Sequence, residues 1–222
     1  MWDRLEALIG EKSVKELSKK TILIVGLGGV GSYALESLAR SGVGKFIIVD
    51  YDKVDITNIN RQLYALNSTI GVAKVDIAEK RIKDINPKCK IKKYECKFSI
   101  ETKDDICNED IDFIVDCCDD IEAKKQLIRE AIKRDIDIIS CMGMAKKLDP
   151  KKIEICELSK TYNDPLAKIL RKFIKDEKIN KKIMVAFSSE LPLKTKQLAS
   201  NAFVPSSAGL IIGHYVVSKL IK

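Results

Sequence analysis

The sequence predicts an α/β protein built on a mainly parallel sheet, with helices on both faces of the sheet and a C-terminal extension. Short apolar runs alternate with amphipathic segments of about 10–15 residues, the pattern that βαβ units produce. The first run, TILIV at 21–25, leads directly into a glycine-rich turn, and the second run, KFIIV at 45–49, ends on Asp50. A strand, a glycine turn and a helix in this order are typical of parallel sheets that bind ligands at their strand ends.

Up to Gly143, most of the chain alternates between strand and helix patterns. Gly42 ends one predicted helix and Asn86-Pro87 ends another, because glycine and proline mark helix ends. The predicted elements, in chain order, are helix 3–20, strand 21–25, helix 30–41, strand 45–49, helix 71–85, strand 91–95, strand 111–116, helix 121–134 and strand 136–140.

After Gly143 the rhythm of the sequence changes. Two strand-like runs, 152–158 and 182–187, flank a basic amphipathic helix at 165–177, and an apolar helix follows at 207–221. A length of 222 residues suits one domain with a substantial core. We therefore expect one α/β domain whose C-terminal part is an extension of it.

The composition, with 45% apolar and 32% charged residues, is that of a soluble globular protein. No run reaches the roughly 18–20 apolar residues of a membrane span, and the first 20 residues lack the apolar core of a secretory signal. We expect a cytoplasmic protein with no membrane partner. The seven cysteines form no C-x-x-C pair, which argues against a structural zinc site and favours reduced thiols.

The net charge of +8 indicates an anionic partner. Residues 144–182 contain 12 Lys or Arg and 6 Asp or Glu, so this segment alone has a net charge of +6. It is either a solvated, lysine-rich surface or a patch that neutralises RNA phosphates. Charge alone does not decide between these two interpretations.

The glycine turn, GLGGVGS at 26–32, predicts a phosphate site. Gly26 permits the tight turn, Gly28 lets the backbone approach a phosphate, and Gly31 lets the helix lie close to the sheet. The free N–H groups at the start of the following helix would then meet the phosphate charge. Asp50, 19 residues after Gly31, stands where a ribose-binding acid belongs, but NAD and ATP both contain that ribose.

The polar residues at the other strand ends favour ATP over NAD. The stretch DYDKVDITNINRQ follows the second strand, Lys74 begins the next helix, and DCCDD, with Asp116 and Asp119, closes the fourth strand. Cations there can neutralise phosphate charge that develops during displacement, and a carboxylate can hold Mg²⁺. A dinucleotide with one pyrophosphate needs no such collection, whereas a triphosphate with Mg²⁺ does. A Rossmann-like sheet that binds ATP is therefore the prediction.

GLGGVGS, DYDKVDITNINRQ, GVAKVD and DCCDD together resemble the ATP-dependent adenylating enzymes related to ubiquitin activation. RLEALIGEKSVKEL, INPKCKI and ELSKTYNDPLAKILRKF most resemble the branch that contains the tRNA threonylcarbamoyladenosine dehydratases. The resemblance implies ATP and Mg²⁺ as cofactors and tRNA carrying threonylcarbamoyladenosine at position 37 as substrate. In that branch the carboxylate is adenylated with release of pyrophosphate and then cyclises with loss of AMP.

The resemblance also implies roles for the matching residues. Asp50 would hold the ribose hydroxyls, Asp119 would bind Mg²⁺, and Arg4 would reach across a homodimer into the ATP site of the other subunit. The implied ATP-binding residues are Gly26, Gly28, Gly29, Gly31, Asp50, Asp52, Asn58, Arg61, Gln62 and Lys74, and the implied catalytic residues are Arg61, Lys74, Asp119 and Arg4.

The same resemblance divides the domain into an N-terminal helical arm at 1–20, a nucleotide-binding core at 21–143 and a C-terminal substrate and dimer region at 144–222.

Activation of the C-terminal glycine of a ubiquitin-like sulfur-carrier protein is the alternative function. An NAD-binding oxidoreductase is a third interpretation, but its acid–base pair is not apparent. A sulfur-relay partner, and a thioester or persulfide at Cys117, Cys118 or Cys141, remain open. His214, the only histidine, is expected to be structural.

Overall fold

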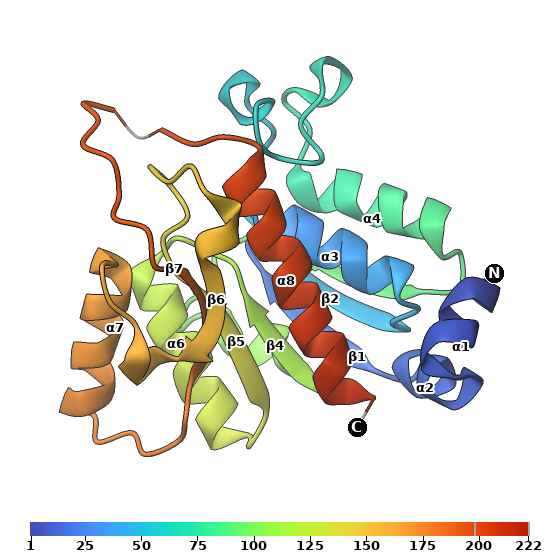
Figure 1. The fold of residues 1–222 in the computed structure, drawn as a ribbon. Helices are drawn as coiled ribbons and strands as arrows, with labels where there is room; N and C mark the ends of the chain where they lie inside the picture. Colours follow the sequence, from blue (N-terminus) through green and yellow to red (C-terminus); the bar gives the residue numbers. More distant parts are fainter. Residues whose placement is uncertain (198, 222) are drawn as a thin grey trace.

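One seven-stranded sheet runs through the computed structural model, which describes residues 1–197 and 199–221 (Figure 1). Its strands are β1 (Thr21–Val25), β2 (Lys45–Val49), β3 (Lys90–Tyr94), β4 (Phe113–Asp116), β5 (Asp137–Cys141), β6 (Ile153–Glu157) and β7 (Met184–Ser188). Their order in the sheet is β3-β2-β1-β4-β5-β7-β6, and only the pair of β6 and β7 is antiparallel. The predicted α/β, Rossmann-like, mainly parallel sheet is confirmed.

The helices alternate with the strands as the sequence pattern predicts. They are α1 (Asp3–Ile9), α2 (Glu11–Leu17), α3 (Gly31–Arg40), α4 (Lys74–Ile85), α5 (Lys103–Ile106), α6 (Ile121–Lys133), α7 (Pro165–Asp176) and α8 (Phe203–Leu220). Short 3₁₀ helices lie in the connections: η1 (Ile56–Asn58), η2 (Asn67–Thr69), η3 (Pro150–Lys152) and η4 (Leu158–Lys160). The 3₁₀ helices and α5 were not predicted.

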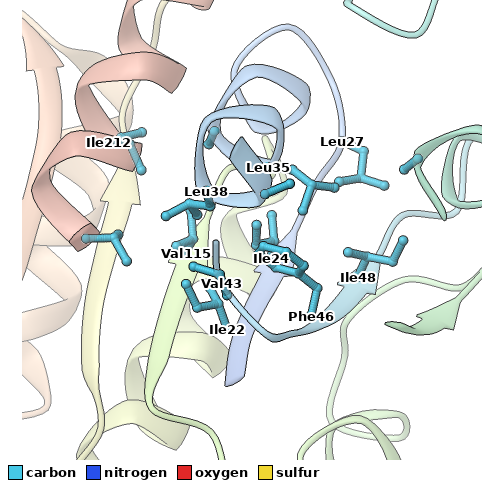
Figure 2. Packing of buried hydrophobic residues seen from close by; sticks show 14 of the residues in the cluster. Ile22, Ile24, Leu27, Leu35, Leu38, Val43, Phe46, Ile48, Val115 and Ile212 are labelled. Carbon is cyan, nitrogen blue, oxygen red and sulfur yellow. The ribbon is translucent and has the colours of Figure 1, made fainter. Parts of the chain in front are cut away.

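Two apolar cores form because successive strand residues point to opposite faces of the sheet. Ile22 and Ile24 of β1 belong to the core beneath α3, α4 and α8, whereas Leu23 and Val25 belong to the core beneath α6 and α7. In the first core, Leu35 and Leu38 of α3 lie over β1, and Ile212 of α8 points toward the same cluster (Figure 2). Helices therefore cover both faces of the sheet, as predicted.

Three predicted helix boundaries were wrong. The helix predicted over 3–20 is two helices, α1 and α2, because Gly10 between them has φ +87°. The helix predicted from residue 71 begins only at Lys74, after Gly71 with φ +82°. The last helix begins at Phe203 and not at Ser207, because the Asn201 side-chain oxygen accepts the backbone N–H groups of residues 203 and 204.

In the C-terminal region, α8 packs closely along α3. A Cβ at Gly209 would lie 2.3 Å from the Val30 carbonyl oxygen, and one at Gly213 would lie 2.0 Å from Ser37 Oγ. These two glycines, four residues apart on one helix face, thus allow two helix backbones to meet. Residues 198 and 222 of the predicted region 144–222 lie outside the described residues. Along the described chain, no helix combines the length and apolar character needed to cross a membrane.

Candidate functional site

A cleft of about 1090 Å³ opens at the carboxyl ends of the parallel strands, between the loops that follow β1, β2, β4 and β5. β1 and β4 are neighbours in the sheet, but the connection after β1 leads to β2 on one side and the connection after β4 leads to β5 on the other. Ligands of such sheets bind at this point. The segment that follows β2 rises above this edge of the sheet (Figure 1). The predicted residues that line the cleft are Gly26, Gly28, Gly29, Asp50, Asp52, Asn58, Arg61, Gln62, Lys74 and Asp119.

The glycine turn has the backbone geometry that its sequence predicts. Gly26 has φ +89°, and a Cβ there would lie 2.7 Å from the carbonyl carbon of Cys117 at the end of β4. Gly31 begins α3, and a Cβ there would lie 1.8 Å from the Gly26 carbonyl oxygen. At Gly28 the nearest atom to such a Cβ is Gln62 Nε2, at 3.7 Å. The turn is therefore tightly packed on the sheet side and open on the cleft side at Gly28.

Asp50 holds the glycine turn in place from the end of β2. Its Oδ2 accepts the Leu27 N–H at 2.6 Å and its Oδ1 accepts the Asp52 N–H at 2.8 Å. Burial raises the pKa of Asp50, and the Lys74 ammonium and these two N–H groups only partly offset that effect. Asp50 thus has a structural role in the turn as well as a place in the cleft wall.

Lys74 brings a positive charge to the floor of the cleft. The chain folds back after β2, and the Lys74 N–H donates to the Asp52 carbonyl at 3.0 Å. The Lys74 ammonium then lies 2.7 Å from Asp52 Oδ2 and 4.0 Å from Asp50 Oδ1. Lys74 is 4% exposed, whereas the Asp52 side chain is 45% exposed. A buried ammonium next to a solvated carboxylate can exchange that partner for a phosphate oxygen.

Arg61 brings a second positive charge to the cleft. Its Nη1 donates to the Thr57 carbonyl at 2.8 Å and to Asn60 Oδ1 at 3.0 Å. In the part of the chain that the structure describes, no carboxylate oxygen lies within 4.0 Å of its guanidinium. Asn58, one turn earlier, accepts the Asp55 N–H on its Oδ1, so its amide N–H groups are left for the cleft. Arg61 and Lys74 therefore form a cationic site beside the glycine turn.

The acids of DCCDD separate into two kinds. Asp119 is exposed and lines the cleft, whereas Asp116 is completely buried below it. Asp116 accepts hydrogen bonds from Lys124 Nζ at 3.0 and 3.1 Å and from the Ser140 hydroxyl. Its grouping with the cleft residues in the sequence analysis was wrong, because its charge is already neutralised inside the protein.

Lys124 is a residue of this region that was not predicted from the sequence, and so is Lys97, which lines the cleft. The Lys124 ammonium is completely buried and also donates to the Cys141 carbonyl at 2.8 Å. Lys124 follows Ile121 by three residues and precedes Leu127 by three, so it occupies the apolar face of α6. A lysine at a core position of an amphipathic helix was the available signal.

Three of the four cysteines that line the cleft, Cys117, Cys118 and Cys141, are unsuited to nucleophilic chemistry. Burial raises the pKa of the Cys141 thiol to about 12 and that of the Cys117 and Cys118 thiols well above the ordinary value. Thiolates are the reactive form of cysteine, so these groups are protonated and inert at neutral pH. A thioester or persulfide role at these positions gains no support from their surroundings.

Two predicted residues do not line the cleft. Gly31 lies directly behind the turn, where it packs on Gly26. Arg4 is exposed on α1. Because α1 precedes β1, it lies toward the amino ends of the strands, whereas the cleft lies at their carboxyl ends. His214 is exposed on α8 and is also absent from the cleft wall.

Carboxylates of the cleft fit Mg²⁺ better than they fit a metal held by protein alone. Among the described residues, no group of three His, Cys, Asp or Glu is placed to hold a metal ion. Mg²⁺ is usually bound by one or two carboxylates together with substrate phosphates and water. Asp119, which is exposed, and Asp52, which is half-exposed, supply such carboxylates on the cleft wall.

Two relatives resemble this chain over most or all of its length. A Bacillus subtilis protein named tRNA threonylcarbamoyladenosine dehydratase is 42% identical over 240 aligned positions, covering 100% of this chain and 94% of the relative. A Haemophilus influenzae protein of the same name is 36% identical over 187 positions, covering 84% of this chain and 72% of the relative.

Solved structures also resemble this chain over nearly its whole length. The crystal structure of Escherichia coli tRNA N6-threonylcarbamoyladenosine dehydratase in complex with ATP has a TM-score of 0.93 and 29% sequence identity. The match covers 99% of this chain and 93% of the E. coli chain. The AMP complex of that protein has the same TM-score and identity. The model of the ThiF family matches residues 3–172, which include the glycine turn, Arg61, Lys74 and Asp119. The chain therefore belongs to the ThiF family.

Proposed function

We propose that this chain is an ATP-dependent dehydratase of tRNA that carries threonylcarbamoyladenosine at position 37. Its resemblance to proteins of that name over the whole chain supports the substrate. The observation that carries the chemistry is the cleft, where Lys74, Arg61 and Asp119 surround the open side of the glycine turn. The proposed products are AMP, pyrophosphate and the cyclic form of the modified adenosine.

In this mechanism the chain positions ATP and neutralises its charge. Asp50 accepts the ribose hydroxyls, and the backbone around Gly28 and Gly29 contacts the phosphates. Arg61, Lys74 and Asn58 donate to phosphate oxygens while the substrate carboxylate attacks the α-phosphorus and pyrophosphate leaves. The attacking carboxylate is already an anion, so this step needs no general base and depends on orientation and electrostatics.

Asp119 is the proposed Mg²⁺ ligand, with Asp52 at the edge of the same site. Bound Mg²⁺ would neutralise the phosphate oxygens and the leaving pyrophosphate. Lys74 would hold Asp52 in place through their 2.7 Å ion pair until the nucleotide binds. The exposure of both carboxylates supports this assignment, because Mg²⁺ keeps several of its waters.

We also propose a homodimer, in which Arg4 of each subunit enters the cleft of the other. Exposed apolar side chains on the segment after β2 and on α8 support a subunit interface: Ile56, Ile59, Leu66, Ile70, Val72, Phe203 and Leu210. The two groups adjoin, because Asn60 Nδ2 donates to the Ser200 carbonyl at 3.0 Å. Surfaces of this kind are usually buried in an oligomer.

The sulfur-relay partner stays a prediction, and so does cytoplasmic localisation.

Incubation with ATP, Mg²⁺ and tRNA that carries threonylcarbamoyladenosine tests the proposed function. Release of AMP that depends on this tRNA, and loss of one water from the modified nucleoside by mass analysis, are the expected results. Unmodified tRNA is the matched control and should release no AMP. Pyrophosphate exchange that required a sulfur-carrier protein, with the tRNA inert, would replace the proposal by the alternative function. Sedimentation of the same preparation tests the dimer.

A further inference from the structure

We infer that the exposed face of α7 binds the sugar–phosphate backbone of the tRNA substrate beyond the modified nucleotide. This inference rests on the proposed function and adds the surface on which the RNA lies. Ala167, Leu170 and Phe173 of α7 are buried against the core, which leaves the opposite face of the helix to solvent. That opposite face is basic.

Three exposed lysines form a row along this face. Lys168, Lys172 and Lys175 are spaced four and three residues apart, so their side chains project from the same side of the helix. Among the described residues, none of the three has a carboxylate oxygen within 4.0 Å, and Glu177 at the end of the helix pairs with Arg129. Asp176, exposed four residues after Lys172, carries the one opposing charge within α7, so the row keeps a net positive charge.

A second feature extends the row at the carboxyl end of α7. A groove of about 490 Å³ is lined there by Arg171, Lys175 and Lys178 together with apolar and neutral residues, and none of the described residues in its wall is a carboxylate. Arg171 is fixed at the groove because its Nη1 donates to the Thr161 carbonyl at 2.8 Å and to the Thr161 hydroxyl. A fixed guanidinium in a groove without acids is suited to a phosphate.

The position of α7 connects these cations with the ATP cleft. Asp164 caps the helix and also accepts the Gly143 N–H at 3.0 Å, and Leu166 lines the cleft itself. The helix has 12 residues and therefore extends roughly 18 Å away from that wall. A nucleotide bound in the cleft would thus have its neighbouring phosphates directed along the lysine row.

RNA suits this face better than an acidic protein does. Lysine is depleted at protein–protein interfaces, which depend on aromatic and aliphatic anchors. Ile169 is the one large apolar side chain among the strongly exposed residues of α7 that the structure describes, with 42% exposure. Evenly spaced cations with one exposed apolar side chain beside them match the repeating charge of a phosphate backbone better than they match a protein interface.

The test compares two triple variants with equal loss of charge. Lys168→Ala/Lys172→Ala/Lys175→Ala removes the row, and Lys80→Ala/Lys88→Ala/Lys90→Ala removes three exposed lysines from α4, β3 and the loop between them. α4 and α7 lie on opposite sides of the molecule (Figure 1). All six lysines are exposed, so both proteins should fold with unchanged circular dichroism. The probe is tRNA carrying threonylcarbamoyladenosine, titrated at several salt concentrations.

The α7 variant should bind this tRNA roughly tenfold or more weakly at low salt, and its salt slope should fall by about two to three units. The control variant should bind within about twofold of the unaltered protein, and both should bind ATP normally without tRNA. Equal losses in the two variants, or no loss in the α7 variant, would overturn the inference alone. If the unaltered protein bound a carrier protein and no tRNA, the proposed function would fail with it.

Discussion

The ammonium of Lys124 lies 3.0 Å from one carboxylate oxygen of Asp116 and 3.1 Å from the other, and neither side chain is exposed. Burial is the largest single effect and lowers the pKa of Lys124, but the combined attraction of Asp116, Cys118 and Cys141 outweighs it, so the net shift is upward. The pair connects α6 to the end of β4, and the Cys141 carbonyl connects it to β5. Asp116 Oδ1 also accepts the Cys118 N–H, so the loop that presents Asp119 is attached to this buried ion pair.

Lys124→Met should therefore destabilise the protein by about 3–5 kcal/mol, because it leaves the Asp116 carboxylate buried without a counterion. Denaturant unfolding measures this loss. Asp116→Asn added to Lys124→Met removes the uncompensated charge and keeps an acceptor for Ser140, so much of the stability should return. A single Lys124→Met that cost less than about 1 kcal/mol would contradict the buried ion pair.

Acid should unfold Arg81→Met at a higher pH than the unaltered protein. Burial alone would raise the pKa of Glu36, but hydrogen bonds from Arg81 and Arg40 outweigh it, and the pKa lies below its ordinary value of 4.5. Arg81 donates to Glu36 at 2.7 and 2.9 Å. A lowered pKa contributes stability above the unfolded value, and this stability is lost as pH falls through the folded value. Circular dichroism between pH 6 and 2 measures the midpoint of acid unfolding. An equal midpoint in Arg81→Met and the unaltered protein would show that the ion pair of Arg81 with Glu36 does not contribute to stability.

Gly31→Ala and Gly28→Ala should both weaken ATP binding, but only Gly31→Ala should destabilise the fold. A methyl group at Gly31 would collide with the Gly26 carbonyl oxygen at 1.8 Å, so this variant should lose thermal stability and nucleotide binding together. A methyl group at Gly28 meets only the end of Gln62 at 3.7 Å, so the protein should fold normally but bind ATP more weakly. Thermal melts and calorimetric titration with ATP separate the two effects. Normal ATP affinity in folded Gly28→Ala would remove the phosphates from this side of the turn.

Arg61→Ala and Asp119→Asn should each lower the rate of AMP formation by about 10²–10³-fold, the usual effect of removing one group that stabilises developing charge. Both side chains lie at the cleft surface and make few hydrogen bonds within the protein, so the melting temperatures of the two variants should equal that of the unaltered protein. Asp119→Asn should in addition require more Mg²⁺ for half-maximal rate. Lys53→Ala, on the same segment as Arg61 but outside the cleft wall, is the matched control. Full activity in either variant would exclude that residue from the site.

The candidate site could largely be predicted from the sequence where its signals are local. The turn at Gly26 needs a positive φ, and Asp50 directly follows a buried strand, so both can be recognised from their immediate neighbours. The burial of Asp116 could not be predicted from the sequence, because an acid at the end of a strand has the same sequence pattern whether it faces the cleft or the core. Its burial depends on Lys124, which comes from a helix on the other side of the loop.

By itself the sequence determined the order of strands and helices, the phosphate turn and the residues gathered at the carboxyl ends of the parallel strands. Periodicity and turn chemistry encode these features, since they depend on residues close together in the chain. Tertiary structure alone decided that Lys74 pairs with Asp52, that α8 approaches α3 through Gly209 and Gly213, and that β6 runs antiparallel to β7. Each of these depends on how distant segments pack, and the same local pattern is compatible with several packings until the core closes.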